Sequence, residues 1–246
     1  METNPLLIFV AASVALLIGL SKGGLGGTMG VLATPLMALV MPADQVIGLL
    51  LPVLMFADVF AVAFHWGYWN RWFVILLVPG GVLGVTIGTF FITNAPTETL
   101  QLLLGVIVLF FALYKIFEKQ LLRWLTYRPH NWHGVAAGTV AGFSSALAHT
   151  GAPPVSIYLL LQKVTPRVFI ATNALFFAIL NWIKVPYYWY AGLFDFALLR
   201  QMAWMLPVAF VGVGMGRGMA GKISPQQYEQ LILALLIISA LLLIFT

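Results

Sequence analysis

Long apolar runs dominate the pattern of hydrophobic and polar positions along the chain, and the charged residues fall in the short gaps between them. A helix needs about 20 residues to cross a hydrocarbon core about 30 Å thick. Six runs reach that length, and we predict a membrane-spanning helix in each of them: 45–65, 71–91, 97–117, 167–189, 197–217 and 226–245.

Two further stretches, 5–41 and 133–163, are too long for one straight span and are interrupted near their middle. The first interruption is SKGGLGG at 21–27, and the second is AHTGAPP at 148–154. Each flank has roughly 12–17 residues, which is short for a full crossing. We therefore expect each stretch to form either a tight helical hairpin or a broken, re-entrant pair of helices.

The two halves of the chain share a pattern of small residues and prolines, at an offset that drifts only from 123 to 129. The matching pairs are Gly19 and Gly142, Ser21 and Ser144, Pro42 and Pro166, Gly67 and Gly192, Pro79 and Pro207, Gly84 and Gly212, Gly88 and Gly216, and Pro96 and Pro225. The pattern predicts a duplication within one membrane domain: a first repeat at 1–117, a basic linker at 118–132 and a second repeat at 133–246.

The positions of the cations predict the orientation of the chain. The region between the halves carries Lys115, Lys119, Arg123 and Arg128, and loops rich in lysine and arginine stay in the cytoplasm. Tracing the spans outward places both termini on the non-cytoplasmic side and gives each half an odd number of crossings. The expected fold is therefore an all-α polytopic membrane protein of two inverted repeats, a plan common in secondary transporters.

Composition supports the membrane assignment. Of the 246 residues, 62% are hydrophobic and only 8% are charged, whereas a soluble domain has about 25% charged residues. The net charge of +5 is dispersed between apolar runs, so it indicates membrane orientation and not a nucleic-acid partner. The chain has no cysteine, which excludes disulfides and thiolate chemistry. The first residues lack the basic segment of a secretory signal, so we expect the first apolar run to be retained.

The two interruptions are the strongest candidates for a binding site. A glycine-rich break exposes backbone amides, and a following helix turns its positive end toward them. Two such breaks meeting from opposite sides would hold one small anion, and nearby hydroxyls and a cation would complete its coordination. The candidate substrate-binding residues are Ser21, Lys22, Gly23, Gly24, Gly26, Gly27, Ser144, Ser145, His149, Thr150 and Gly151.

Other interpretations of these residues remain open at this point. The glycines could form tight packing turns, as expected for the ridge of Gly80, Gly84 and Gly88, where small residues let helices approach closely. Lys22 could mark the cytoplasmic end of the first segment. His149 could carry a coupling proton or donate to substrate, or it could be hydrogen-bonded within the helix bundle.

Asp58 and Lys184 lie within apolar runs, where charges are costly and usually face the interior in pairs. The repeat places Asp58 opposite Asn181, within one turn of Lys184, so an Asp58–Lys184 pair is one expectation. The alternative is that Lys184 extends to the outer interface. Asn173 and His65 complete the residues expected along a transport pathway.

Enzymatic function is not indicated. The sequence has no HExxH, GxSxG or Walker motif and no acidic cluster suited to a metal, so we expect no cofactor. Ser144 and Ser145 precede His149 at helical spacing, but no third group orients the histidine. No ATP-binding module is present, so coupling would use a proton, a sodium ion or the substrate gradient itself.

The segments GLSKGGLGG at 19–27, running on to Pro35-Leu36, and GFSSALAHTGAPPVSIYLL at 142–160 resemble the sulfite exporter TauE/SafE family of bacterial membrane permeases. The resemblance implies a permease of the bacterial inner membrane that moves sulfite, thiosulfate, sulfonates or related organic acids. One departure is the second break, which has Ser, Ala and His where the family is often richer in glycine. An anion channel without alternating access is the alternative function, and an intramembrane enzyme is a second rival.

Overall fold

A computed structural model describes residues 4–25, 29–124 and 130–219, together with positions 233, 237, 238, 241 and 242. Within these residues every regular element is helical, so the predicted all-α class is confirmed there. In chain order the elements are α1 (Pro5–Leu20), η1 (Ser21–Leu25), η2 (Met29–Leu32), α2 (Ala33–Ala38), α3 (Ala43–Phe64), α4 (Arg71–Asn94), α5 (Thr97–Trp124), α6 (Asn131–Ala148), α7 (Ala152–Leu161), α8 (Pro166–Tyr190), α9 (Phe196–Gln201) and α10 (Met205–Met219).

Five helical segments of the described chain are long and apolar enough to cross a membrane. They are Pro5–Gly24, Ala43–Phe64, Arg71–Asn94, Glu98–Phe117 and Pro166–Tyr190. Four of them coincide with the predicted spans at 45–65, 71–91, 97–117 and 167–189. Helix α5 continues to Trp124, so the first part of the predicted linker is helical.

The predicted span at 197–217 is wrong, because the structure divides it into α9 and the 15-residue α10. Residues 202–204 form a turn between them, and Pro207 lies in the first turn of α10. Proline is well tolerated there because the first N–H groups of a helix have no intrahelical partner. The predicted span at 226–245 lies almost wholly outside the described residues.

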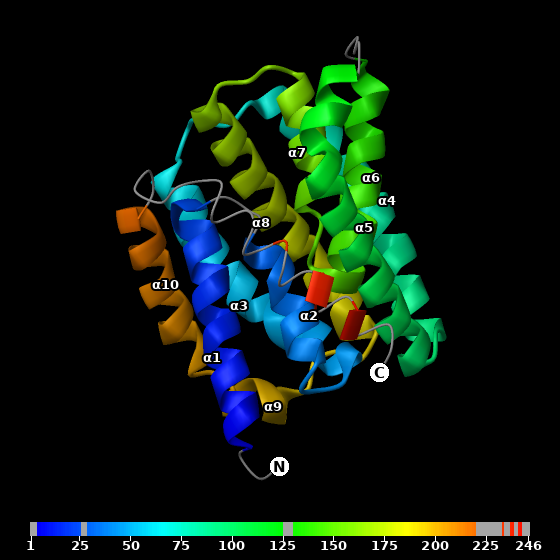
Figure 1. Cartoon of the computed structure of the whole chain (residues 1–246), viewed down its shortest axis with the longest axis vertical. Coiled ribbons are helices and arrows are strands. Elements are labelled where there is room, and N and C mark those ends of the chain that lie inside the picture. The colour runs from blue at the N-terminus through cyan, green and yellow to red at the C-terminus, as the bar shows by residue number, and fades with distance from the viewer. Residues whose placement is uncertain are drawn as a thin grey trace.

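Both interruptions lie where the sequence predicts them. Helix α1 passes into the short π-helix η1, in which Gly24 has a φ of 145°, and the chain resumes with η2 and α2. Helix α6 ends at Ala148, and His149 adopts a left-handed conformation (φ 53°) before α7 begins. In Figure 1, α1 starts near the N-terminus at the lower end of the molecule, whereas α7 lies at the upper end.

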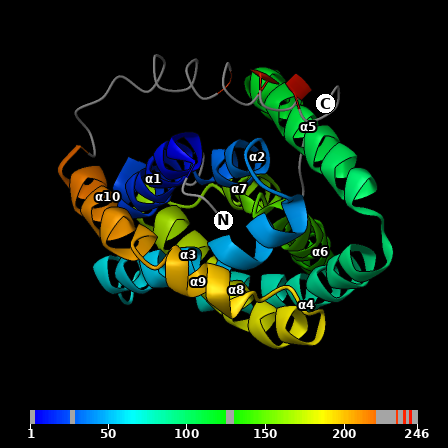
Figure 2. The same cartoon turned by 90° about the horizontal axis from the view of Figure 1, so that it is seen from below.

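Glycines hold two helix pairs at very short separation. A Cβ built on Gly80 of α4 would lie 1.9 Å from the carbonyl oxygen of Val135 in α6, and one built on Gly19 of α1 would lie 2.1 Å from the carbonyl oxygen of Ala209 in α10. The predicted role of small residues in close helix packing is thus confirmed. Figure 2 shows the α1–α10 and α4–α6 pairs on opposite sides of the molecule, with α3 and α8 between them.

The turn that follows α3 contacts α8, and the turn that follows α8 contacts α3. Gly67 and Gly192 both have positive φ, 80° and 69°, in the turns after α3 and α8. The N–H of Asn70 donates to Thr172 Oγ1 in α8 at 3.0 Å. Reciprocally, a Cβ on Gly48 in α3 would lie 1.9 Å from the carbonyl oxygen of Leu193. These contacts fix α3 and α8 beside the two interruptions.

Candidate functional site

A cavity of about 80 Å³ lies between the two interrupted stretches and the central helices. Eight of the residues singled out from the sequence line it: Ser21, Lys22, Gly24, His65, Ser145, His149, Asn173 and Asn181. They come from η1, α3, α6, α8 and the break after α6. Segments more than 100 residues apart in the chain therefore contribute polar groups to one cavity.

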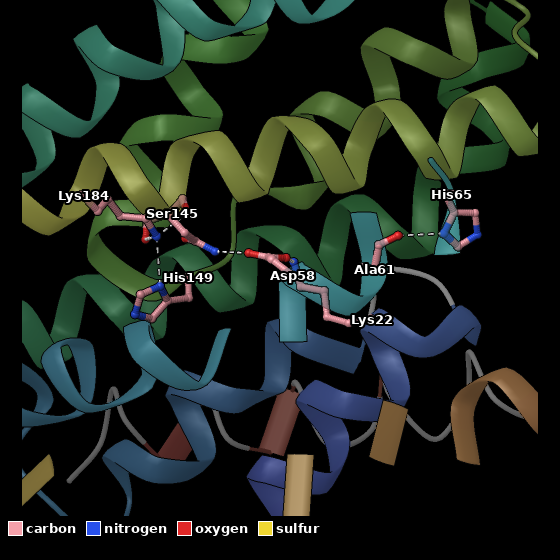
Figure 3. A network of polar contacts seen from close by, with 8 residues as sticks. Lys22, Asp58, Ala61, His65, Ser145, His149 and Lys184 are labelled. Carbon is pink, nitrogen blue, oxygen red and sulfur yellow. Dashed lines mark hydrogen bonds and ion pairs between the residues drawn. The ribbon is translucent and has the colours of Figure 1, made fainter. Parts of the chain in front are cut away.

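Asp58 is the centre of the first group of polar contacts at the cavity. It is only 2% exposed. Lys22 of η1 forms an ion pair with Oδ1 of Asp58, and Asn181 Nδ2 of α8 donates to Oδ2 at 2.6 Å. Both carboxylate oxygens are therefore engaged, by residues from two other elements (Figure 3).

Lys184 is the centre of the second group and is 0% exposed. Its ammonium donates to Ser145 O at 3.2 Å, to Ser145 Oγ at 3.0 Å and to His149 Nδ1 at 3.0 Å (Figure 3). An ammonium group can only donate, so Nδ1 of His149 accepts. The Nε2–H of His149 then donates to the carbonyl oxygen of Ile47 at 3.0 Å. His149 is thereby held as the neutral Nε2–H tautomer with both ring nitrogens occupied.

The Asp58–Lys184 pair considered from the sequence is replaced by a pairing of Asp58 with Lys22. Lys184 also does not extend to the outer interface, because its side chain is fully buried. The physical reason lies in Ser145, whose carbonyl is among the last of α6. The final carbonyls of a helix carry partial negative charge, and a cation is stabilised beside them.

His65 and Asn173 leave hydrogen-bonding capacity at the cavity. The Nδ1–H of His65 donates to the carbonyl oxygen of Ala61 at 3.0 Å, which leaves Nε2 available. Asn173 is 9% exposed, and its buried Oδ1 accepts no hydrogen bond from the part of the chain that the structure describes. A buried carbonyl oxygen without a donor is costly, so Asn173 Oδ1 can accept a hydrogen bond from a ligand.

The other predicted site residues lie beside the cavity or outside the description. A Cβ on Gly23 would lie 2.2 Å from the carbonyl oxygen of Val213, and one on Gly151 2.5 Å from that of Ala141, so both glycines permit close packing. The hydroxyls of Ser144 and Thr150 donate to backbone carbonyls at 2.8 Å and 3.3 Å. These side chains shape the breaks without lining the cavity. Gly26 and Gly27 lie outside the described residues.

Two contributors to the site are absent from the sequence-based set. Phe177 lines the cavity, and its ring centroid lies 5.5 Å from Lys22 Nζ. The chain has 18 phenylalanines, and nothing in the sequence distinguishes Phe177 from the others. The carbonyl of Ile47, which accepts from His149, is a backbone group, and side-chain chemistry could not have indicated it.

The two groups of contacts contain two amines and one carboxylate. Lys22 is paired with Asp58, and Lys184 donates to Ser145 and His149. Within the described residues no three His, Cys, Asp or Glu side chains are grouped to hold a metal ion. The arrangement is suited to hold an anion against Lys22 and the amides of Asn173 and Asn181.

Comparison with known proteins gives the family of the chain. Residues 11–243 match the family described as sulfite exporter TauE/SafE. Comparisons with curated proteins and with solved structures find no match. The match spans nearly the whole chain, and together with the apolar helices it identifies an integral membrane transport protein. The chain therefore belongs to the sulfite exporter TauE/SafE family.

Proposed function

We propose that the protein is a secondary transporter that moves a small anion, such as a sulfur oxyanion, a sulfonate or a related organic acid, across the bacterial cytoplasmic membrane. The anion binds in the cavity between the two breaks. The observation that carries this proposal is the cavity itself, which has residues of both breaks in its wall, the cation Lys22 among them.

The size of the cavity favours a compact substrate. On this measure of volume, a cavity needs about 10–15 Å³ to hold one water molecule, so about 80 Å³ has room for several small groups. An anion of a few heavy atoms fits such a space. Lys22 supplies the charge, and Asn173 supplies an Oδ1 that has no donor in the described chain.

We propose further that the halves are inverted repeats related by an axis in the membrane plane. Asp58 and Asn181, which are joined by a hydrogen bond, are 123 residues apart, the same offset as Gly19 and Gly142. The first helix of each half, α1 or α6, packs through glycines against a helix late in the other half, α10 or α4. Packing of the first helix of each half against the other half is expected when the two halves are related by a twofold axis.

The cavity opens toward the cytoplasm in this proposal. Its lining lies in the C-terminal half of α3, including His65, and the N-terminal part of α8. Arg167 lies in the first turn of α8, and Arg71 begins α4 after the turn that follows α3, as the positive-inside rule expects of a cytoplasmic face. Both chain termini are then outside the cytoplasm.

Direct hydrogen bonds close the opposite side of the cavity. Tyr188 OH donates to the carbonyl oxygen of Ala146 at 2.7 Å, and the bond from His149 to Ile47 ties the second break to α3. Alternating access would require these bonds to break while the cytoplasmic side closes. In this proposal, the described arrangement is the state in which an exporter loads its substrate.

The test is efflux of radiolabelled sulfite from proteoliposomes. Wild-type protein should transport sulfite, and Asn173→Leu should reduce the rate by at least about tenfold, because it fills the cavity and removes the unpaired Oδ1. Asn94→Leu is the matched control, since Asn94 is exposed at the end of α4. Equal rates in the two variants would overturn the assignment of the site. Single-channel currents far above carrier turnover would select a channel instead.

A further inference from the structure

Lys22 has two roles at the cavity that compete. It lines the space assigned to the anion, and the same ammonium pairs with Asp58. Lys184, the other cation, donates to three acceptors in the second break and is not among the residues that line the cavity. A bound anion and the ionised Asp58 would therefore share a single available cation.

Such sharing is unfavourable at membrane depth. A charge left uncompensated in a low-dielectric interior is strongly destabilising. If an anion replaced Asp58 as the partner of Lys22, the carboxylate would keep only its bond from Asn181. If Asp58 takes up a proton, its carboxyl group is neutral and no uncompensated negative charge remains beside the bound anion.

We propose that Asp58 is the binding site of a co-transported proton, so that anion and proton bind together and cross together. This inference rests on the proposed transport function and deepens it. The proton attaches to Oδ1, the oxygen that Lys22 vacates, while Asn181 keeps donating to Oδ2. Lys22 stays protonated and turns to the anion.

The charges of the two states balance. In the empty site the charges of Lys22 and Asp58 cancel. In the loaded site Lys22 is positive, Asp58 is neutral and a singly charged anion is bound, so the sum is again zero. The protein therefore carries the same charge across the membrane in its loaded and empty states, and the cycle is electroneutral for a monovalent anion.

The surroundings of Asp58 distinguish it from the other titratable groups. Lys22 of η1 and Lys184 of α8 face this region, His149 lies beyond Lys184, and His65 lies at the end of α3 itself. Protonation of His149 at Nδ1 would remove one of the three acceptors of the Lys184 ammonium and place two cations side by side. His65 makes no contact with the Lys22–Asp58 pair, so its protonation leaves Lys22 occupied.

The test measures initial rates of sulfite efflux from proteoliposomes at mildly acidic pH, where most sulfite is the singly charged hydrogensulfite. Rates from protein-free vesicles are subtracted. A membrane potential is set by a potassium gradient with valinomycin, and a pH gradient is imposed separately. Three proteins are compared: wild type, Asp58→Asn and Asp195→Asn. The last is a matched control, because Asp195 caps α9 away from the site and asparagine caps equally well.

For wild type and Asp195→Asn we expect a rate that follows the pH gradient and changes less than about twofold with the potential. Asp58→Asn should lose the response to the pH gradient and gain a response to the potential of about tenfold, because it carries an uncompensated anion. A wild-type rate that follows the potential and ignores the pH gradient would overturn the proposal, and that measurement needs no variant. A folded Asp58→Asn protein that behaves as wild type would also overturn it. Absence of any protein-dependent efflux in wild type would overturn the transport function and this inference together.

Discussion

Replacing Gly80 with alanine should force helices α4 and α6 apart. A Cβ at this position would lie 1.9 Å from the carbonyl oxygen of Val135, whereas ordinary contact begins at 3.4 Å. The helices would have to separate by about 1.5 Å. The obstacle is a backbone atom within α6, so no side chain can rotate away to relieve it. Overpacking of this kind costs about 1–3 kcal/mol, against a gain of about 1 kcal/mol from the higher helix propensity of alanine.

Because the obstacle is backbone, the cost of overpacking should lie at the upper end of this range, so the net loss should be about 2 kcal/mol, which corresponds to a fall in Tm of roughly 4–8 °C for a chain of this size. Thermal unfolding of the purified protein in detergent, followed by tryptophan fluorescence, measures it. Gly214→Ala is the control, because a Cβ on Gly214 in α10 meets nothing within 4 Å. That variant should keep or slightly raise the Tm. Equal Tm values for the two variants would refute the role of the glycine ridge in holding α6, and with it the second break, in place.

Three further predictions follow from the geometry of the breaks and from the charge pattern. Gly24→Val should abolish sulfite binding in equilibrium dialysis because Gly24 has a φ of 145° and lines the cavity. Gly218→Val, whose Cβ would meet nothing within 4 Å, should retain it. Unchanged binding by folded Gly24→Val would make the first break a packing turn only. Ser145→Ala removes one of three acceptors of the Lys184 ammonium and should lower unfolding stability by about 1 kcal/mol, so an unchanged Tm would contradict the contact. A reporter active only in the cytoplasm should be silent when fused to the C-terminus, and strong activity would contradict the inverted topology.

The sequence predicted the two breaks because glycine and proline clusters within apolar runs leave backbone groups that must be satisfied locally. It could not decide the partner of Asp58. Lys184 was the partner considered from the repeat and Lys22 was not, because the pairing depends on how each helix is rotated about its axis. The same limit applies to Pro79 and Pro207, which are matched in the repeat. Pro79 lies inside an unbroken α4, whereas Pro207 follows a turn and lies in the first turn of α10.

Ligand-dependent thermal unfolding of the purified protein tests the central claim most directly, namely that a small anion binds between the two breaks. The probes are sulfite, thiosulfate, methanesulfonate and acetate, each added to wild type, Asn173→Leu and Asn94→Leu. A ligand at about 100 times its Kd adds about 2.7 kcal/mol of stability, which corresponds to roughly 5–10 °C in Tm for a chain of this size. We predict such a shift with at least one sulfur anion for wild type and Asn94→Leu, and its loss in Asn173→Leu. A shift of equal size in Asn173→Leu, or no shift of the wild type with any of these anions, would contradict the account.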